Sequence, residues 1–314
     1  MQAGSSYARN MHRPPEHTAL QLRRVRYHAH HKLGLRWPFF AVRALYTIGC
    51  PFEAYSCLRD ACAPALGAGA FLSLPDKAKV KNRILSALPK AEFEMLAPAM
   101  TLVDLDLGQT LHRQGDIIEH VHFVETGFIS ALAVLSDGQP LEIGLIGAEG
   151  VAGFSVVLGG KTAYSETMCQ TGGKAYRLPA GALKDAFEKA PVLRDLLLRY
   201  ALIFQVQVSQ TAACNAHHAL EQRLARWMLA AHDRSGVPEL SLTQDLIAVM
   251  LGVRRATVSI AASTLQKAGV IRYQHGKITI LDRAGLENAA CECYEAVAGE
   301  YRRLFGEHIA ADPA

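Results

Sequence analysis

The sequence has 314 residues, of which 50% are hydrophobic and 20% are charged, and its formal net charge is +4. This length allows about two domains, and the composition is ordinary for a globular protein. No apolar run approaches the roughly 18 residues that span a bilayer, the N-terminus lacks a secretory signal, and the seven cysteines are too irregular for a disulfide framework. We therefore expect a protein of the reducing cytoplasm without a membrane partner.

The N-terminal segment, residues 1–79, differs from the rest of the chain. Between Met1 and Asp60 there are nine Lys or Arg residues, three acids and five histidines, without sustained periodicity. This composition indicates a disordered or extraneous segment, and the alternatives are a DNA-binding arm or a targeting peptide. If the segment is extraneous, translation could begin at Val80, and an intact mass of the native protein that includes residue 1 would reject this hypothesis.

Residues 80–190 are predicted to form a β-roll domain, in which a short helical stretch over 86–100 comes before the strands. From Leu102 to Leu178, short alternating runs are separated by regularly spaced glycines, which favours a compact antiparallel sandwich or roll. Asp137-Gly138 is a hairpin signal, because glycine accepts the positive φ that a tight turn requires.

Residues 191–216 are predicted to form one long helix with a proline at its first position. Its apolar residues follow a heptad-like seam that turns polar at Gln207, which favours a dimer contact with a second copy over packing on its own domain. The seam consists of Leu193, Leu196, Tyr200, Ile203, Gln207, Gln210 and Cys214, widened by Leu197 and Phe204.

Residues 217–283 have the pattern of a winged helix-turn-helix. After an amphipathic helix, Ser241-Leu-Thr-Gln244 fits a capping box for a second helix, which stops at Gly252. Ala248, Gly252 and Val258 supply the small residue, the turn glycine and the apolar anchor that two helices crossing at about 90–120° require.

A recognition helix and a β-hairpin wing are predicted to follow. The inner face of the helix contains Val258, Ala261, Ala262 and Leu265, and a Gln-His-Gly turn at 274–276 joins the two wing strands. Five Lys or Arg residues and no acid occur from Leu251 to Leu281, which is the electrostatic pattern of phosphate binding. A winged helix used for protein contact is the alternative. A final helix near 284–305 is expected in the C-terminal segment 284–314.

This order of β-roll, long helix and winged helix resembles the Crp/Fnr superfamily of bacterial regulators over about residues 82–283. The best-matching pieces are Gln114-Gly115-Asp116, Val124-Glu125-Thr126-Gly127 and Leu242-Thr243-Gln244 through Leu251 to Val258. The resemblance implies an α+β transcription factor and not an enzyme, with an N-terminal double-stranded (jelly-roll-like) β-roll. It also implies a homodimer that places each recognition helix in a major groove of a roughly palindromic promoter site. The expected partners are double-stranded DNA, a second copy and RNA polymerase.

The resemblance also assigns roles on the recognition helix. Arg255 matches the family's first base-reading arginine, suited to bidentate contact with guanine, and Thr257 matches a phosphate-contacting hydroxyl. Ala256 and Ile260 depart from the family, where an acidic base reader and a second arginine are common, so the operator must differ from its best-known palindrome. The expected base-reading residues are Arg255, Ser259, Ile260 and Ser263. The expected backbone-contacting residues are Arg254, Thr257, Lys267, Arg272 and Lys277.

In the cyclic-nucleotide-binding members, a cassette holds the ribose and the cyclic phosphate. At the matching positions, Phe154 replaces the ribose-binding carboxylate, Tyr164 replaces the phosphate-binding arginine, and Glu166 adds a negative charge. A desolvated phosphate without its arginine and beside a carboxylate is strongly disfavoured, so we expect no cyclic AMP binding and no cofactor. The degenerate cassette consists of Gly153, Phe154, Tyr164 and Ser165.

A redox-responsive regulator of the same fold is the alternative function. Some family members hold an iron–sulfur cluster on N-terminal cysteines plus one in the roll, and the candidates here are Cys50, Cys57, Cys62 and Cys169. Ordinary unligated cysteines are the preferred interpretation. Cys291 and Cys293 lie in a helical pattern in which residues two apart point away from each other, which indicates a structural role and no metal site.

An enzyme on a metal-binding β-barrel is the alternative of a different class. His120 and His122 would share one face of a strand, as metal ligands in such a barrel do. No histidine occurs between Phe123 and Ala216 to supply the usual third imidazole. We therefore interpret the two histidines as outward-facing polar residues.

Overall fold

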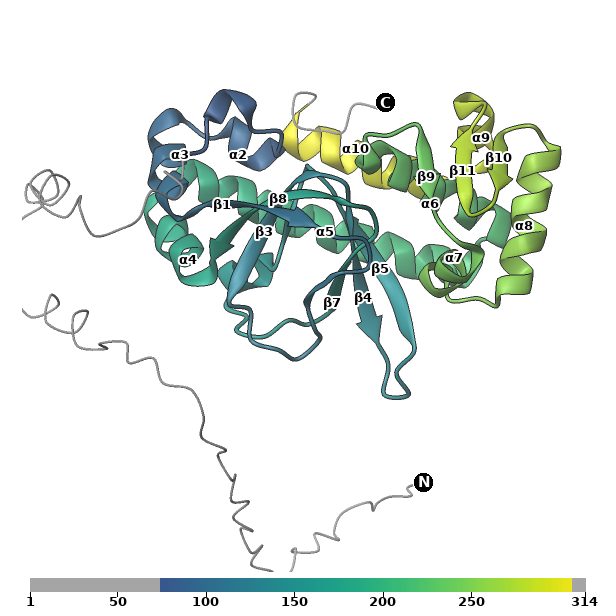
Figure 1. Ribbon diagram of the computed structural model, residues 1–314, viewed down its shortest axis with the longest axis horizontal. Coiled ribbons are helices and arrows are strands. Elements are labelled where there is room, and N and C mark those ends of the chain that lie inside the picture. Colours follow the sequence, from purple (N-terminus) through teal and green to yellow (C-terminus); the bar gives the residue numbers. More distant parts are fainter. Residues whose placement is uncertain (1–73, 307–314) are drawn as a thin grey trace, which may run out of the picture. The chain divides into compact units, whose positions relative to one another are not determined.

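The computed structural model describes residues 74–306, and Figure 1 shows how their helices and strands are arranged. The predictions for residues 1–73 lie outside the described residues. Residues 74–79, which the sequence analysis assigned to the N-terminal segment, include a short 3-10 helix capped by the Asp76 side chain.

The first half of the described chain forms a β-roll with short helices at both ends. Its strands make two antiparallel four-stranded sheets, ordered β1-β8-β3-β6 and β2-β7-β4-β5. The helices are η2 (Lys77–Lys79), α2 (Arg83–Ala87), α3 (Lys90–Leu96), η3 (Ala97–Ala99), η4 (Phe154–Leu158) and α4 (Ala180–Lys189). The strands are β1 (Thr101–Leu105), β2 (Thr110–His112), β3 (His120–Thr126), β4 (Ile129–Val134), β5 (Pro140–Ile146), β6 (Val151–Ala152), β7 (Glu166–Cys169) and β8 (Gly173–Pro179).

The predicted roll is confirmed, and its core is apolar. Phe123 and Leu178 are fully buried, and Ile146 is nearly so, all within one hydrophobic cluster. The expected hairpin joins β4 to β5 through a turn in which Gly138 has a φ of 84°. Alternating apolar residues thus form the buried faces of the two sheets, and the glycine allows the tight turn between β4 and β5.

Helix α5 (Pro191–His217) confirms the predicted long helix, but its seam lies inside the chain. Every predicted seam residue except Gln210 is buried. Tyr200 and Phe204 pack on Phe154 of the roll, with ring centroids 5.2 and 5.3 Å apart. The expectation that this seam forms a dimer contact is therefore wrong, because apolar periodicity shows which helix face is buried but not what buries it.

The second half of the described chain is the winged helix domain. Its elements are α6 (Leu220–Ser235), β9 (Glu239–Ser241), α7 (Gln244–Leu251), α8 (Arg255–Lys267), β10 (Ile271–Gln274) and β11 (Lys277–Ile280). The strands form an antiparallel sheet in the order β10-β11-β9. The wing turns at His275 and Gly276, whose φ values of 52° and 75° are both positive, as a two-residue type I′ hairpin requires. Within residues 74–306 no single helix is long and apolar enough to cross a membrane, and the bent pair α7 and α8 passes that test by length and composition alone.

The N-cap of α7 differs from the expected capping box. Thr243 is the cap, and its Oγ1 accepts a hydrogen bond of 3.2 Å from the backbone N–H of Leu246. Ser241 is instead the last residue of β9 and pairs with Lys277 of β11. Ser241, which the sequence motif predicts as the N-cap residue of α7, is therefore paired in β9 of the wing sheet instead.

The predicted single helix over 284–305 is two helices, α9 (Arg283–Ala289) and α10 (Cys293–Phe305). Leu286 of α9 belongs to the core of the winged helix domain, whereas Tyr301 and Phe305 of α10 belong to the core that the roll shares with α5. The chain breaks at Ala290, whose ψ of 157° is extended. The break lets the two halves of the predicted helix bury their apolar residues in different cores.

A buried carboxyl group connects the roll to the winged helix domain. Glu142 of β5 accepts hydrogen bonds from the Ser130 hydroxyl (2.5 Å) and from Trp227 Nε1 of α6 (2.7 Å). Burial raises the pKa of Glu142 to about 7, although both hydrogen bonds act in the opposite direction. Phe128 and Leu145 of the roll lie in the same hydrophobic cluster as Trp227, so the carboxyl group is enclosed by apolar contacts.

We predict that Glu142 makes stability depend on pH. The unfolded carboxyl group has a pKa near 4.5, so the folded chain binds more protons between pH 4.5 and about 7, and the free energy of unfolding falls as the pH rises through that window. Glu142→Gln keeps an acceptor for Trp227 without a charge and should remove roughly 2–3 kcal/mol of this decline. Urea unfolding at about pH 5 and pH 8 measures it. The exposed Glu94→Gln is the control, and a Glu142→Gln profile equal to that of the wild type would refute the assignment.

Candidate nucleic-acid interface

Helices α7 and α8 meet at the angle of a helix-turn-helix. Their axes are bent by 104°, within the motif's range of about 90–120°. Ala248 and Val258 are 6% and 0% exposed, and Gly252 forms a left-handed C-cap of α7 with a φ of 63°. This turn needs glycine for its φ, because residues with a Cβ atom rarely adopt the left-handed region.

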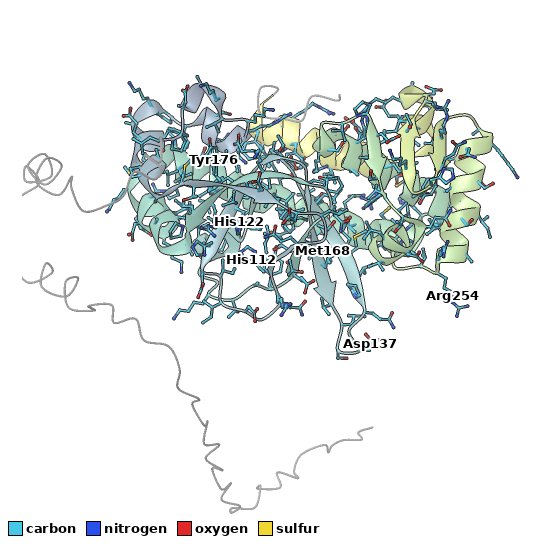
Figure 2. The ribbon with its side chains drawn as sticks, in the orientation of Figure 1. His112, His122, Asp137, Met168, Tyr176 and Arg254 are labelled. Atoms are coloured by element: carbon cyan, nitrogen blue, oxygen red, sulfur yellow. The ribbon has the colours of Figure 1, made fainter. Side chains whose placement is uncertain are left out.

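Helix α8 presents all four predicted base-reading residues to solvent. Arg255, Ser259, Ile260 and Ser263 are exposed, and the apolar Ile260 is 65% exposed. They recur about once per helical turn, opposite the buried face that contains Val258. Figure 2 shows Arg254 at the N-terminal end of α8, where its side chain projects from the domain. The structure therefore brings these side chains together on one accessible face.

The predicted backbone-contacting residues are exposed on the helix and on the wing. They are Arg254, Thr257 and Lys267 at α8, Arg272 on β10 and Lys277 on β11. Two acids that precede the acid-free stretch face this surface: Asp245 lies 3.6 Å from Arg255, and Glu239 lies 2.7 Å from Lys277. Exposed pairs of this kind contribute at most about 1 kcal/mol, so a phosphate or a base can replace either carboxylate at little cost.

A hollow of about 380 Å³ opens between the starts of α7 and α8 and the wing. It is lined by Thr243, Gln244, Asp245, Arg255, Tyr273, His275 and Gly276. Tyr273 holds the wing in place, because its hydroxyl donates a hydrogen bond of 2.8 Å to the Leu242 carbonyl. Gln244 and His275 were not predicted at the interface, because only the folded wing brings them to the same hollow as Arg255.

The nucleotide cassette of the roll is filled by its own side chains. Phe154 is 5% exposed and Ser165 is 4% exposed. Tyr164 is half-exposed at the rim, with its ring centroid 6.4 Å from that of Phe154. Gly153 lines the cavity that remains, which has a volume of about 20 Å³. That is room for about one water molecule, whereas small-molecule pockets measure about 300–1,000 Å³.

His112 lines the cavity of this cassette, and its ring packs against that of His122; Figure 2 labels both histidines. His122 is 7% exposed, so its prediction as an outward-facing residue is wrong. The ring of His112, on β2 of the other sheet, covers it with a centroid distance of 5.5 Å. Burial lowers the pKa of His122 to about 3, and the neighbouring His112 acts in the same direction. His112 Nδ1 and Nε2 are each 2.8 Å from an oxygen, the Thr167 hydroxyl and the His120 carbonyl respectively. These histidines are neutral members of the roll's interior.

The cysteines are placed differently from the predictions. Cys50, Cys57 and Cys62 of the redox alternative lie outside the described residues. Cys169 is fully buried in β7, and burial raises the pKa of its thiol to about 11. Cys291 lies in the break between α9 and α10 and not in a helix, so the prediction that its side chain and that of Cys293 point apart is wrong.

Comparisons with known proteins agree with this architecture. Residues 102–190 match the cyclic nucleotide-binding domain, and residues 222–289 match the Crp-like helix-turn-helix domain. The global nitrogen regulator of Synechocystis sp. is 24% identical over 214 residues, which cover 65% of this chain and 95% of that regulator. The transcriptional regulator LdrP of Thermus thermophilus is 26% identical over 202 residues, covering 60% and 96%. The structure of FixK2 from Bradyrhizobium japonicum has a TM-score of 0.54 at 18% identity, covers 61% of this chain and 98% of that chain, and supports the fold alone.

The β-roll, the long helix and the winged helix-turn-helix define a DNA-binding transcriptional regulator with a cyclic-nucleotide-binding-like domain. The chain belongs to the Crp/Fnr family. The predicted family, fold class and regulatory role are confirmed, and the matching relatives are transcriptional regulators rather than enzymes. The comparisons do not favour the redox-responsive alternative.

Proposed function

We propose that the chain binds a palindromic promoter site as a homodimer, with α8 of each copy in a major groove. The observation that carries this proposal is the exposed face of α8, which stands on a helix-turn-helix bent by 104°. Such a helix enters the major groove with its N-terminal residues at the base edges. Arg255 is the first residue of α8 and has the fork geometry that reads guanine.

The reading face indicates an operator with its own sequence. Ile260 has no hydrogen-bonding group and is 65% exposed, which suits contact with a thymine methyl group in the major groove. Ala256 supplies no acceptor for cytosine. Arg254, Lys267 and Arg272 flank this face and suit phosphate contacts, which position the helix without reading sequence.

We predict that Arg255→Ala relaxes sequence preference at one base pair in each half-site, at a cost of about 1–3 kcal/mol for the preferred base. Arg254→Ala is the matched control, and it should weaken binding to all sequences alike and lower the salt dependence of binding. Selection of duplexes from a randomised pool by the purified full-length chain, at two salt concentrations, measures both effects. Uniform weakening by Arg255→Ala would contradict its role as a base reader.

The outer face of α5 suits the contact with the second copy. Leu198 and Leu202 are 46% and 47% exposed although they lie on an otherwise well-packed helix. Further along α5, exposed residues follow at sequence intervals that alternate between three and four residues. This is the spacing of the contact positions in a two-stranded coiled coil. These positions are Leu198, Leu202, Gln205, Ser209, Ala212 and Ala216.

We predict that Leu202→Glu weakens the dimer, because two like charges would face each other across the contact between parallel helices. Analytical ultracentrifugation over a concentration series should show at least a tenfold higher dissociation constant. Leu107→Glu is the control, since Leu107 is also exposed (62%) but lies between β1 and β2, outside α5. An unchanged mass for Leu202→Glu would exclude this face as the interface.

We also propose that the roll does not bind cyclic AMP. Phe154 occupies the cassette and leaves a cavity of about 20 Å³. The arginine that would pair with the cyclic phosphate is replaced by Tyr164, and Glu166 follows two residues later. We infer that this regulator works in the cytoplasm and contacts RNA polymerase there. A signal received by the roll would act by changing the geometry of α5.

We predict that titration of the full-length chain with cyclic AMP in a calorimeter gives no binding isotherm at micromolar concentrations. The physical reason is that neither the space nor the cation for a cyclic phosphate is available in the cassette. Titration of the same sample with a selected DNA duplex serves as the control for active protein. A saturating micromolar isotherm would overturn the proposal.

A further inference from the structure

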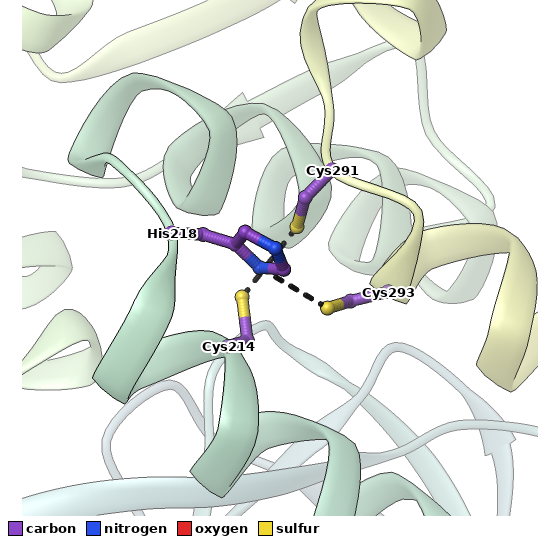
Figure 3. A group of neighbouring side chains, drawn as sticks. All are labelled: Cys214, His218, Cys291 and Cys293. Carbon is purple, nitrogen blue, oxygen red and sulfur yellow. Dashed lines mark hydrogen bonds between the residues drawn. The ribbon is translucent and has the colours of Figure 1, made fainter.

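Four side chains of the types that can ligate a metal ion converge where α5 ends and where α9 is followed by α10 (Figure 3). They are Cys214, His218, Cys291 and Cys293, and their ligand atoms all lie within 4.8 Å of one another. Cys214 and His218 are four residues apart and therefore face the same side at the end of α5. Cys291 and Cys293 reach the same point because the chain turns between α9 and α10.

The distances among these atoms approach those of a coordination tetrahedron. Cys214 Sγ and Cys291 Sγ are 3.5 Å apart, and Cys293 Sγ and His218 Nδ1 are 3.4 Å apart. With Zn–S bonds of about 2.3 Å and Zn–N bonds of about 2.0–2.1 Å, neighbouring ligand atoms of a tetrahedral site are about 3.5–3.8 Å apart. The widest pair would move closer by about 1 Å, and the set of three cysteines and one histidine is one that structural zinc uses.

Two neighbouring side chains, Glu292 and Gln210, contact His218 and Cys293 in ways that favour metal binding. His218 Nε2 lies 3.2 Å from the Glu292 carboxylate, which directs the other ring nitrogen, Nδ1, toward the sulfurs. A carboxylate on the far nitrogen of a ligating histidine is a recurrent feature of zinc sites. Gln210 Nε2 donates a hydrogen bond of 3.0 Å to Cys293 Sγ, which stabilises negative charge on that sulfur.

The charge of the surroundings also fits a thiolate-bound ion. The three cysteines are at most 4% exposed, and Arg223 and Arg226 beside them are each 9% exposed. Among the described residues, the Nε atoms of both arginines are buried without a hydrogen-bond partner. Three thiolates, a neutral histidine and Zn²⁺ carry one net negative charge, which is complementary to the buried guanidinium groups beside the cluster.

We propose that Cys214, His218, Cys291 and Cys293 bind one structural Zn²⁺ ion that joins α10 to the end of α5. All four tetrahedral positions are taken by side chains, so no position remains for a catalytic water. His218 lies between α5 and α6, which begins at Leu220. The ion therefore holds the joint between the long helix and the first helix of the winged domain, and it ties the chain that follows the wing to the same point.

The test uses the full-length chain purified without chelator, with metal content measured by mass spectrometry and Co²⁺ exchanged for Zn²⁺ as a spectroscopic probe. The wild type should retain one more equivalent of zinc than Cys293→Ser or Cys291→Ser. Its Co²⁺ form should show the intense visible bands of tetrahedral thiolate coordination. Cys169→Ala is the matched control, because Cys169 is equally buried but lies in the roll. Circular dichroism checks that each variant is folded.

His218→Gln keeps the test decisive if a cysteine variant does not fold, since this side chain is 21% exposed at the rim of the cluster. The Co²⁺ spectrum of that variant should shift as one nitrogen ligand is lost. A chelator should lower the unfolding temperature of the wild type and of Cys169→Ala. It should not change the unfolding temperature of Cys293→Ser. Three results would contradict the proposed zinc site. They are equal metal content in all variants, an unshifted Co²⁺ spectrum for His218→Gln, and a Cys214–Cys291 disulfide in the purified protein. None of these measurements uses DNA, so the result is independent of the proposed operator binding.

Discussion

The close approach of α5 to the β-roll is the constraint on which the rest of the described structure depends. A Cβ atom on Gly150 would lie 2.6 Å from Tyr200 Cε2, and one on Gly144 would lie 3.1 Å from Phe204 Cε2. Carbon atoms in good contact are about 3.5–4.0 Å apart, so a side chain at position 150 would displace the Tyr200 ring, and one at position 144 would crowd the Phe204 ring. The two rings then enclose Phe154, which occupies the nucleotide cassette. The packing of Tyr200 and Phe204 on Phe154 thus fills the cassette and buries the seam of α5. The opposite face of α5 stays exposed.

The winged helix domain is attached to this assembly by buried polar contacts as well as by apolar ones. Glu142 joins Trp227, and Arg234 Nε of α6 lies 2.6 Å from Glu149 of the roll, with both side chains buried. The Arg234 guanidinium also lies 5.7 Å from the ring centroid of Tyr301 on α10. Losing either partner of such a pair leaves an uncompensated buried group, so these contacts specify one arrangement of α6. The cysteine–histidine cluster lies at the neighbouring joint, where α5 gives way to α6.

The parts that sequence predicted well depend on short-range signals. The helix from Gln244 to Leu251, the left-handed turn at Gly252 and the wing turn at His275-Gly276 each follow from residues within one or two turns of chain. The cap of α7 was misplaced because Ser241 and Thr243 both fit a capping pattern, and pairing of β9 with β11 decides between them. His122 was expected to face outward because a strand's alternation does not show whether a neighbouring strand covers that face.

The sequence by itself determined the class of protein, the order of its domains and the face of α8 that meets solvent, because periodicity, turn residues and charge are local properties of the chain. Only the tertiary structure decided what covers each apolar face. The seam of α5 looked suited to a second copy and is buried on the roll, while Leu198 and Leu202 stay outside. It also decided which cysteines meet, since Cys214 and Cys291 are 77 residues apart and the break after α9 brings them together. Contacts at such separation depend on the packing of whole elements, which no local pattern encodes.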